Sequence, residues 1–412
     1  MQDSSRYAVG IDIGTTMVRC VVGHVDSTTG VPTIVGVGQA SNSGVRKGTV
    51  VNLSGPAHAM DAALGEAERM SGHEVNEATL SVNGSHIIST KADGMIAVGM
   101  ADHEVNSDDI ARVEDVATTG KIPANREILE VVPHSYKLDG QDNIKDPLGM
   151  SGTRLEIEAN VVSALVPFVV NVQKTAEMAT VKSNGVVPSV LASAKAVLSE
   201  RQIESGVAVV DMGGSTTGVA VFEEGDLQYV SVVPVGGVNI TNDLAIGLKT
   251  DPEIAEKVKI AHASAAGRES KDTVTLKYEK DTLSFDAGEI DEIVEARLDE
   301  IFEAVQKELK KAGRAGQLPS GVVLTGGGAL MKGIAEYAKE RLGLAVRVGK
   351  PTGFGGTVDH VNQPEFSSAI GLLLVDAEAG VQPAAKKPGQ KGKKALGNAG
   401  GFVSGILGRF KP

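Results

Sequence analysis

Two short segments of the sequence place an aspartate, glycines and hydroxyl residues between two apolar runs. Residues 6–26 read RYAVGIDIGTTMVRCVVGHVD, and residues 207–226 read VAVVDMGGSTTGVAVFEEGD. Each pattern predicts a tight β-hairpin whose turn gathers several backbone N–H groups in one concavity, where glycine lets a ligand come close. Such turns suit phosphate groups. Asp12 and Asp211 would face each other across a cleft and hold Mg²⁺ through water.

The two hairpins have the same layout, with their aspartates 199 positions apart. A glycine-rich hairpin turn is common, so either one alone would be an ordinary turn. Their repetition predicts two duplicated lobes, each of which contributes one turn to a shared cleft. The residues expected to contact phosphate are Gly14, Thr15 and Thr16 in the first turn and Gly213, Gly214, Ser215, Thr216 and Thr217 in the second.

A third glycine-rich segment, VVLTGGGALMKGIAEYAKERLG, occupies residues 322–343. It predicts a strand, a loop and an amphipathic helix with Leu330, Ile334 and Ala338 on one face. By itself it is an ordinary strand-to-helix loop, although helix N-termini favour anions. Its candidate ligand contacts are Gly326, Gly327, Gly328 and Ala329.

The composition is that of a globular protein, with 412 residues, of which 42% are hydrophobic and 22% charged. This length is enough for two or more lobes with their own cores. Cys20 is the only cysteine, which excludes an intramolecular disulfide and a multi-cysteine metal site. The first residues lack the pattern of a signal peptide, and no run of about 18 apolar residues occurs. We therefore expect a cytoplasmic protein without a membrane-spanning helix.

Charge is unevenly spread along the chain, whose net charge is −12. Residues 381–412 hold seven lysines and arginines and no acid, so residues 1–380 carry −19. An acidic body does not suit general nucleic-acid binding, whereas a basic tail suits an anionic surface.

The segment GFVSGILGRF at 401–410 is apolar and follows a lysine- and glycine-rich stretch. At about 100° per residue on a helix, its large apolar side chains fall in one arc with an arginine at the edge. This pattern predicts an amphipathic helix in a membrane interface. The alternative is a helix that docks back on the acidic body. The expected lipid contacts are Phe402, Val403, Ile406, Leu407, Arg409 and Phe410.

One such helix would hold a membrane weakly. Burial of its apolar side chains yields about 5–10 kcal/mol, whereas ordering its residues costs on the order of 10 kcal/mol. Firm attachment therefore needs many tails on one object, which a polymer supplies through effective concentration.

The three glycine-rich segments together resemble those of the superfamily of actin, sugar kinases and chaperone ATPases. Within it, several stretches are similar to the FtsA family of bacterial cell-division proteins, namely GVRKGTVVNL, EVVPHSYKLDGQDNIKDPLGMSG, VVDMGGSTTGVAVF, PVGGVNITNDLA and VVLTGGGALMKG. The resemblance covers about residues 6–376. It implies an α/β fold of the actin-like ATPase type, with duplicated ribonuclease-H-like lobes around a nucleotide cleft. It also implies an inserted small domain, called 1C, and a C-terminal amphipathic helix.

The resemblance also implies cofactors and further site residues. ATP with Mg²⁺ would occupy the cleft, with the third glycine-rich segment against adenosine. Glu256 and Lys259 share a face of the helix expected at 252–263 and would touch ribose and adenine. Without the resemblance, this pair would be a solvated ion pair. Gly237 and Asn239 would also contact the nucleotide.

The resemblance implies a domain organisation in which both lobes are interrupted. Its segments are subdomain 1A at 1–84 and 165–204, the 1C domain at 85–164, subdomain 2A at 205–240 and 313–362, subdomain 2B at 241–312, a return helix to 1A at 363–380, a basic flexible linker at 381–400 and a membrane-targeting helix at 401–412.

Members of this family polymerise with ATP, bind the C-terminal peptide of the tubulin-like FtsZ and tie it to the inner membrane. The resemblance therefore implies a peripheral protein on the cytoplasmic face of the plasma membrane, at the division septum. It implies FtsZ binding at about residues 240–312, filament contacts through 1C, and contacts with other division proteins and anionic lipids, but not with nucleic acid.

Two positions depart from the pattern of relatives. Met17 follows Thr16 where many members have a lysine, so we expect one phosphate contact to be missing. Val187 precedes Pro188 where relatives that hydrolyse ATP well carry Glu or Gln. Because positioned acid–base help is worth roughly 10²–10⁴ in rate, we expect slow or negligible hydrolysis, with ATP acting as a conformational ligand.

Two other functions stay open. A small-molecule kinase of the same fold would need a carboxylate base near the γ-phosphate, and residues 187–200 offer only Glu200. A pilus-assembly adaptor of the same superfamily would bind a short peptide from a membrane protein, but such adaptors typically lack the basic linker and the terminal helix.

Overall fold

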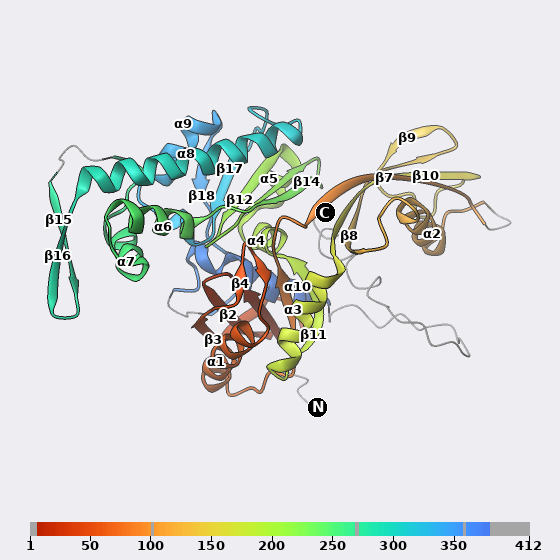
Figure 1. Ribbon diagram of the computed structural model, residues 1–412. Coiled ribbons are helices and arrows are strands. Elements are labelled where there is room, and N and C mark those ends of the chain that lie inside the picture. The colour runs from red at the N-terminus through yellow and green to blue at the C-terminus, as the bar shows by residue number, and fades with distance from the viewer. Residues whose placement is uncertain (1–5, 100–102, 268–271, 357–359, 380–412) are drawn as a thin grey trace.

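The computed structural model describes residues 6–99, 103–267, 272–356 and 360–379 (Figure 1). Two lobes lie one above the other in this view, with a small third domain on one side and a β-hairpin at the opposite end. The arrangement mixes helices and sheets, as the predicted α/β class requires. The linker and amphipathic helix expected at 381–412 lie outside the described residues.

The first lobe is built on a five-stranded sheet in the order β11-β6-β1-β2-β3. Strands β1, β2 and β3 form consecutive antiparallel pairs, whereas β6 runs parallel to both β1 and β11. The strands are β1 Arg6–Ile13, β2 Met17–Val25, β3 Pro32–Ser41, β6 Glu77–Val82 and β11 Lys182–Pro188, and a separate short pair consists of β4 Val45–Arg46 and β5 Thr49–Val50.

Helices complete the core of the first lobe. The last described helix, α10, is apolar on almost every side because it packs against both β1 and the helix α4. Gly10 of β1 allows this close approach, since a Cβ atom there would lie 2.4 Å from the carbonyl oxygen of Ala369. The helices are α1 Ser54–Ser71, α3 Val166–Met178, α4 Ser189–Val197, α5 Glu200–Ser205 and α10 Ser367–Ala379.

The second lobe repeats the strand pattern of the first. Strands β12, β13 and β14 form consecutive antiparallel pairs, and β17 runs parallel to β12 as β6 does to β1. The duplication predicted from the two hairpins is therefore confirmed. The strands are β12 Val207–Met212, β13 Thr217–Glu223, β14 Asp226–Val233, β17 Val322–Thr325 and β18 Val346–Val348.

Four helices and a β-hairpin extend the second lobe. The long helix α8 buries one stripe at helical spacing, as its apolar pattern predicts, while its other face carries charges. The elements are α6 Gly237–Gly247, α7 Pro252–His262, α8 Ala287–Lys311, α9 Ile334–Leu342, the hairpin of β15 Thr273–Tyr278 and β16 Asp281–Asp286, and the 3₁₀ turns η1 Gly327–Leu330 and η2 Pro364–Phe366.

The helix after the third glycine-rich segment starts later than expected. Gly333 adopts a left-handed conformation with φ 76° and α9 begins only at Ile334, while the glycines lead into the 3₁₀ turn η1. Leu330 lies in that turn and is 50% exposed. The prediction that Leu330 shares the buried face of this helix was therefore wrong, because the left-handed glycine separates it from Ile334.

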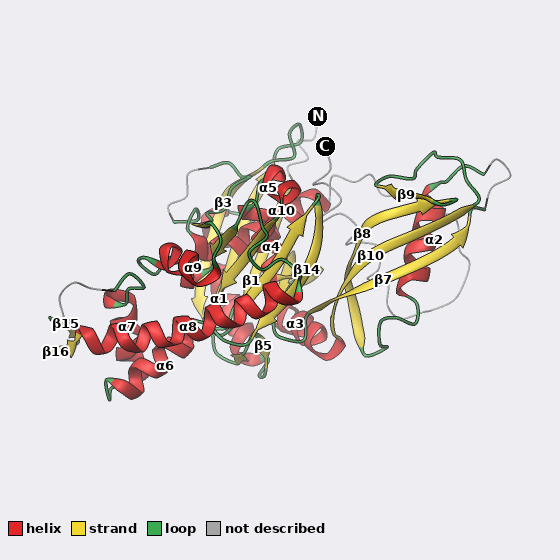
Figure 2. Ribbon diagram, turned by 90° about the horizontal axis from the view of Figure 1, so that it is seen from above, coloured by secondary structure: helices red, strands yellow, loops and turns green. Residues whose placement is uncertain are grey.

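Residues 88–165 form a small domain beside the lobes, and its strands extend the second sheet. That sheet has the order β18-β17-β12-β13-β14-β7-β10-β8-β9. Seen from above, long strands carry this domain away from the lobes, with α2 packed against it (Figure 2). Val113 of α2 and Leu155 of β10 belong to a core of its own. The elements are β7 Ile88–Ala97, α2 Ser107–Thr118, β8 Arg126–Leu138, β9 Gln141–Ile144 and β10 Arg154–Leu165.

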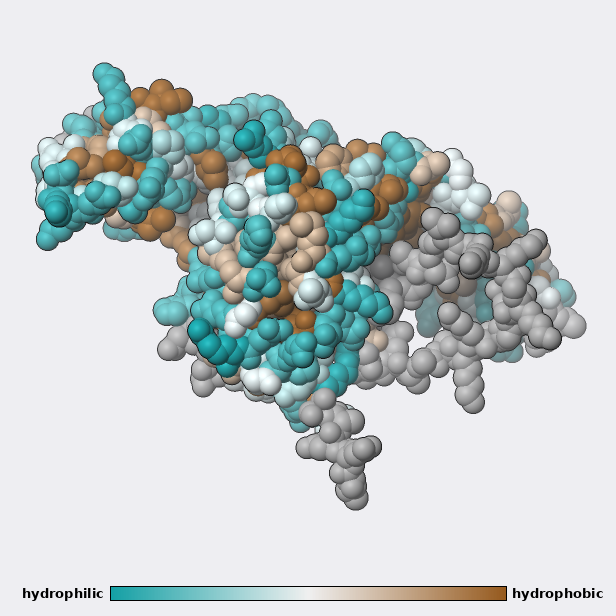
Figure 3. All heavy atoms as spheres, turned by 60° about the horizontal axis from the view of Figure 1, so that its bottom comes forward, coloured by the Kyte–Doolittle hydropathy of each residue, from teal (hydrophilic) through white to brown (hydrophobic). Residues whose placement is uncertain are grey.

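The surface in Figure 3 mixes hydrophilic and hydrophobic residues, with the hydrophobic ones in small groups. Among the large apolar side chains of the described residues, Ile246 at the end of α6 is the most exposed, at 77%. Within the described part of the chain, we find no helix with both the length and the apolar character needed to cross a membrane.

Candidate functional site

A cavity of about 1140 Å³ lies between the lobes, and both predicted hairpin turns line it. The turns come together because each begins at the end of the first strand of its lobe, β1 or β12. The predicted site residues that line the cavity are Asp12, Gly14, Thr15, Thr16, Asp211, Gly213, Gly214, Thr216, Gly237, Glu256, Lys259, Gly326, Gly327 and Gly328.

The two turns touch each other across the lobes. The hydroxyl oxygens of Thr15 and Ser215 lie 2.7 Å apart, although 200 positions separate these residues in the chain. A Cβ atom on Gly214 would lie 3.0 Å from the methyl group of Thr16, so glycine leaves room for the opposite turn. The cleft predicted from the repeated hairpins therefore exists, and residues of both turns line it.

Asp12 is buried and Asp211 is partly buried where they line this cavity, and each accepts a hydroxyl hydrogen bond. Ser368 of α10 donates to Asp12 at 2.9 Å, and Ser193 of α4 donates to Asp211 at 2.7 Å. Burial raises the pKa of Asp211 to about 6, the Ser193 hydrogen bond opposes this, and the negative charge of Asp12 raises it further.

This pair of carboxylates fits a hydrated Mg²⁺ better than a directly bound ion. Repulsion between Asp12 and Asp211 would be offset by a divalent cation. The described residues contain no group of three or more His, Cys, Asp or Glu side chains placed to hold a metal. Mg²⁺ usually keeps several waters and takes one or two carboxylates plus substrate phosphates, which suits this donor set.

Arg19 is a cavity residue that the sequence reasoning missed. It lies on β2 opposite Asp12 in the antiparallel register, and it lines the cavity together with Met17. Its buried Nε atom has no hydrogen-bond partner, and its guanidinium lies 5.2 Å from the centroid of the Phe366 ring. The alternation of side chains along β2 could have identified it, because positions 17 and 19 share a face. The cavity therefore contains a cation near the first turn, while the missing phosphate contact expected at Met17 stays a prediction.

Glu256 and Lys259 of α7 form a partly buried group. The Lys259 ammonium donates to Glu256 at 2.7 Å, to the Thr241 hydroxyl at 2.8 Å and to the Gly237 carbonyl oxygen at 3.1 Å. The pair therefore ties α7 to the first turn of α6 at the cavity wall. It is not the solvated ion pair that the sequence alone would favour.

Four predicted nucleotide contacts do not line the cavity. Thr217 is fully buried and donates to the Val235 carbonyl oxygen at 2.9 Å, because it already belongs to β13. Asn239 accepts from the backbone N–H of Gly236 at 3.0 Å and caps α6. The other two are Ser215, which meets Thr15, and Ala329, which packs in the core of the second lobe.

The third glycine-rich segment packs against the second turn. Gly326 has φ 80°, and a Cβ atom there would lie 2.3 Å from a carboxylate oxygen of Asp211. A Cβ atom on Gly327 would meet nothing within 4 Å. The segment therefore presents backbone to the cavity, where a flat ring could lie against it.

Comparison with known proteins identifies the family. The family described as "Cell division protein FtsA" matches residues 208–371, and the "SHS2 domain inserted in FTSA" matches residues 84–163. A cell division protein FtsA of Pseudomonas aeruginosa is 36% identical over 375 residues, which cover 90% of this chain and 89% of the relative. The chain belongs to the FtsA family. The FtsA of Bacillus subtilis is 35% identical over 90% of this chain and 84% of the relative. The FtsA of Escherichia coli is 31% identical over 91% of each chain.

Solved structures show that this FtsA family member has the actin-like ATPase fold. MreB5 of Spiroplasma citri bound to ADP matches with a TM-score of 0.53 and 12% identity, covering 89% of this chain and 94% of that chain. A PilM–PilN complex of type IV pilus biogenesis matches with a TM-score of 0.65 and 17% identity, covering 91% of this chain and 99% of that chain. At these identities, the similarity concerns the fold alone.

Val187, the position expected to orient water in active relatives, is buried in the core of the first lobe and does not line the cavity. Ser189, two residues later, does line it. The acidic side chains among the described cavity-lining residues are Asp12, Asp211, Glu256 and Glu365.

Proposed function

We propose that this FtsA family member binds ATP in the interlobe cavity, polymerises on the cytoplasmic face of the inner membrane at the division septum and tethers the tubulin-like FtsZ there. The observation that carries the nucleotide part is the contact between Thr15 and Ser215, which brings two matching turns to one cavity. The sequence similarity to FtsA proteins over 90% of the chain supports the division role.

The cavity residues divide into three groups by what each would hold. Backbone N–H groups of the two turns and the Arg19 guanidinium would bind phosphates. Asp12 and Asp211 would hold a hydrated Mg²⁺, whose chemistry is to neutralise phosphate charge. The Glu256–Lys259 pair and the segment at Gly327 would face ribose and base.

Hydrolysis of the bound ATP would be slow. A water molecule near the terminal phosphate needs a group that orients it or accepts its proton. Val187 is apolar and does not line the cavity. Among the acids that do, Glu256 is already paired with Lys259 and Thr241, and Asp12 and Asp211 would hold the hydrated Mg²⁺. ATP would therefore act mainly by holding the lobes in one relative position, which favours a polymer-competent state.

The proposed partners divide between the two ends of the molecule. The FtsZ C-terminal peptide would bind the region of about residues 240–312, where the exposed Ile246 offers an apolar contact. The inserted domain would contact the next subunit of a filament and other division proteins. Support for both proposals comes from the family, not from contacts in this structure.

The membrane proposal concerns residues beyond the described chain. The terminal segment 401–412 would insert into anionic lipid, and the basic linker 381–400 would separate it from the acidic body. Arg6 donates to the carbonyl oxygens of Ala377 at 2.7 Å and Asp376 at 2.6 Å, so the C-terminal turn of α10 is fixed on the first lobe. The linker would thus start from a defined place.

Electron microscopy of the purified protein with ATP on an anionic lipid monolayer tests this function. We expect filaments on lipid with ATP, recruitment of an FtsZ tail peptide, and no filaments without nucleotide. A protein that stays monomeric on lipid with ATP would contradict the proposal. The similarity to the PilM–PilN complex makes a pilus-type adaptor the second candidate, and preferential capture of a pilus peptide over the FtsZ peptide would favour it.

A further inference from the structure

The inserted domain contacts both lobes, but in different ways. Its chain leaves the first lobe after β6 and returns to it at α3. At this root, Arg126 of β8 donates to the Ser163 hydroxyl at 2.9 Å and to the Ser163 carbonyl oxygen at 2.8 Å, and it also donates to the carbonyl oxygen of His86. The two chain connections and the Arg126–His86 contact thus attach the domain to the first lobe, while the Ser163 bonds join two strands of the domain itself.

Its contact with the second lobe has almost no backbone ladder. Strand β7 pairs with β14 only between Ile88 and Ser231, whereas β7 pairs with β10 over its whole length. Side chains replace the missing ladder bonds. The Ser89 hydroxyl accepts from the backbone N–H of Val230 at 3.1 Å and donates to its carbonyl oxygen at 3.4 Å.

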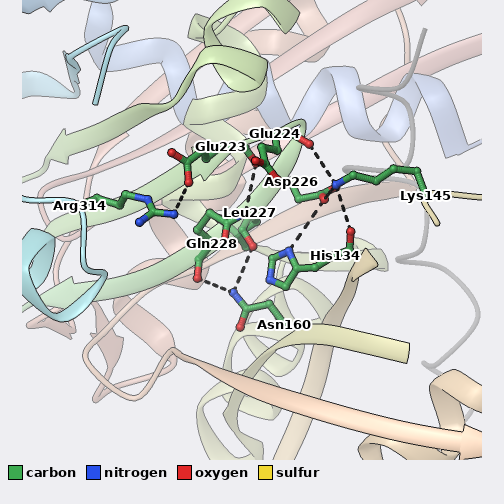
Figure 4. A network of polar contacts seen from close by, with 9 residues as sticks. All are labelled: His134, Lys145, Asn160, Glu223, Glu224, Asp226, Leu227, Gln228 and Arg314. Atoms are coloured by element: carbon green, nitrogen blue, oxygen red, sulfur yellow. Dashed lines mark hydrogen bonds and ion pairs between the residues drawn. The ribbon is translucent and has the colours of Figure 1, made fainter. Parts of the chain in front are cut away.

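Asn160 continues this side-chain contact toward the other end of β14. It is 1% exposed, and its amide donates to the carbonyl oxygens of Leu227 at 3.2 Å and Gln228 at 3.0 Å. Figure 4 shows Asn160 reaching these carbonyl groups from the inserted domain. The Asn160 amide thereby gives a hydrogen-bond donor to carbonyl groups on the unpaired edge of β14, which would otherwise be buried without a partner.

An ion pair forms the last contact between the inserted domain and β14. Lys145, just after β9, donates to Asp226 at 2.7 Å, to the His134 carbonyl oxygen at 3.0 Å and to the Glu224 carbonyl oxygen at 3.3 Å (Figure 4). The Asp226 side chain is only 9% exposed, whereas that of Lys145 is 47% exposed. Lys145 can therefore turn to water, but Asp226 gains water only if the inserted domain moves away.

We propose that Lys145, Asn160 and Ser89 form a releasable latch on β14, which holds the inserted domain at a fixed angle to the second lobe until nucleotide-driven movement of that lobe opens it. We call these contacts the β14 latch. The nucleotide part of this inference rests on the proposed function, whereas the latch itself does not.

The strand that carries the latch is mechanically connected to the cavity. β14 pairs with β13 from Thr217, which directly follows the second turn, to Glu223, which pairs with Asp226. The turn and Asp226 thus lie at opposite ends of one hairpin, with the Ser89 contact at Val230 between them. A rotation that closes the cavity carries Asp226 with it, while Lys145 stays with the domain rooted in the first lobe. Such a rotation must therefore turn the inserted domain or open the latch.

Hydrogen exchange of the full chain without nucleotide tests the latch. We expect Lys145→Met and Asp226→Asn each to accelerate exchange of peptides containing Val230 by about tenfold or more. Lys145→Met leaves the carboxylate of Asp226 buried without its ammonium partner, and Asp226→Asn removes the charge that holds Lys145 on β14. The charge-reversed pair Lys145→Asp with Asp226→Lys should restore slow exchange. Unchanged exchange in Lys145→Met, whose exposed position makes misfolding a small risk, would overturn the latch.

The matched control is Arg314→Met. Arg314 forms an ion pair with Glu223, close to Asp226 in the hairpin, but both partners belong to the second lobe. It should leave exchange at Val230 unchanged. Acceleration equal to that of Lys145→Met would show general loosening of the hairpin and would overturn the latch.

A second arm adds the non-hydrolysable nucleotide AMP-PNP with Mg²⁺ to the unaltered chain. We expect protection of residues 213–216 together with faster exchange at Val230. Protection of the turn without a change at Val230 would overturn the coupling and leave nucleotide binding intact. Absence of any protection at the turn would contradict the proposed nucleotide binding. The exchange rates of the variants without nucleotide would still test the latch.

Discussion

Ser193 of α4 donates a 2.7 Å hydrogen bond to Asp211, a residue of the other lobe. α4 belongs to the first lobe, whereas Asp211 lies near the end of β12, the first strand of the second lobe. Asp12 accepts a similar hydrogen bond at 2.9 Å from Ser368 of α10, but both of these residues belong to the first lobe. Helices of the first lobe therefore orient both acids, and the Ser193–Asp211 bond crosses between the lobes.

These two hydrogen bonds predict how Mg²⁺ and nucleotide binding depend on Ser193 and Ser368. We expect Ser193→Ala and Ser368→Ala each to weaken Mg²⁺-dependent ATP binding by about tenfold, since a hydrogen bond to a charged group is worth about 1.5–3 kcal/mol. Binding in EDTA should change little. Titration with a fluorescent ATP analogue, with and without Mg²⁺, measures both values.

The control for the serine variants is Ser367→Ala. Ser367 is also buried on α10, but its hydroxyl pairs with that of Thr325 at 2.6 Å and not with an acid. Equal losses in all three variants, in Mg²⁺ and in EDTA alike, would assign the effect to packing.

Arg19 predicts a phosphate-dependent change in affinity. Because its guanidinium lines the cavity beside the first turn, we expect Arg19→Met to weaken ATP binding by roughly tenfold or more while adenosine binding stays the same. Arg19→Lys should keep part of the affinity, since it retains the charge but not the fork of donors. Competition titrations with ATP, ADP and adenosine give the comparison. A uniform loss for all three ligands would contradict a phosphate contact.

His86 predicts a pH dependence of stability. Its buried ring stacks on Phe168 with centroids 4.4 Å apart. Burial lowers the pKa of His86 from 6.5 to about 4, the Asn83 carbonyl opposes this, and the Arg126 charge lowers it further. Between these two pH values the unfolded chain binds more protons, so stability is fully present above pH 6.5 and is lost as the pH falls toward 4.

We therefore expect His86→Phe, which keeps a stacked ring, to flatten the fall of the unfolding temperature from pH 6.5 to 4. The pH-dependent part of the free energy of unfolding that this variant lacks is on the order of 2 kcal/mol. His58→Phe, which removes an exposed histidine of α1, serves as the control. Thermal scans at several pH values measure the slope, and parallel slopes for the original chain and His86→Phe would refute the assignment.

Val187 predicts slow turnover of bound ATP. Starting from a typical turnover of about 10 s⁻¹, the lack of a water-orienting group lowers the rate by roughly 10²–10⁴. We expect single-turnover hydrolysis at about 0.001–0.1 s⁻¹ and equal polymerisation with ATP and a non-hydrolysable analogue. A rate well above this range, measured by phosphate release, would show that another residue activates water.

The terminal segment predicts face-specific membrane binding. Ile406→Asp places an acid in the apolar arc, whereas Ser404→Asp places the same charge on the polar side. We expect Ile406→Asp and deletion of residues 401–412 to abolish co-sedimentation with anionic vesicles, while Ser404→Asp weakens it only slightly. ATP binding should survive in all three. Vesicle binding by the deleted chain would place the lipid contact elsewhere.

The parts of the fold that were predictable depend on local patterns. Aspartate and glycines between apolar runs specify a tight turn within a few residues, so both hairpins and the facing of Asp12 and Asp211 could be inferred. The stripe on α8 was equally readable, because its buried residues recur at helical spacing.

The parts that were missed depend on contacts between distant positions. Ser368 and Asp12 are 356 positions apart, and neither residue carries a sign of the other. The latch around Asp226 joins groups from separate domains, for which a single sequence offers no pattern. Leu330 was assigned wrongly for a local reason, since the left-handed turn at Gly333 interrupts a sequence that otherwise has helical spacing.

The position of α10 also bears on how the protein is made. Val9 in the first strand donates its N–H to Asp376 at 2.9 Å, so the core of the first lobe includes a helix 367 positions later. At about 5–20 residues per second of synthesis, β1 emerges from the ribosome roughly 20–70 s before that helix exists. The lobe that begins first is therefore completed last, and its apolar strands lack their covering helix during that interval.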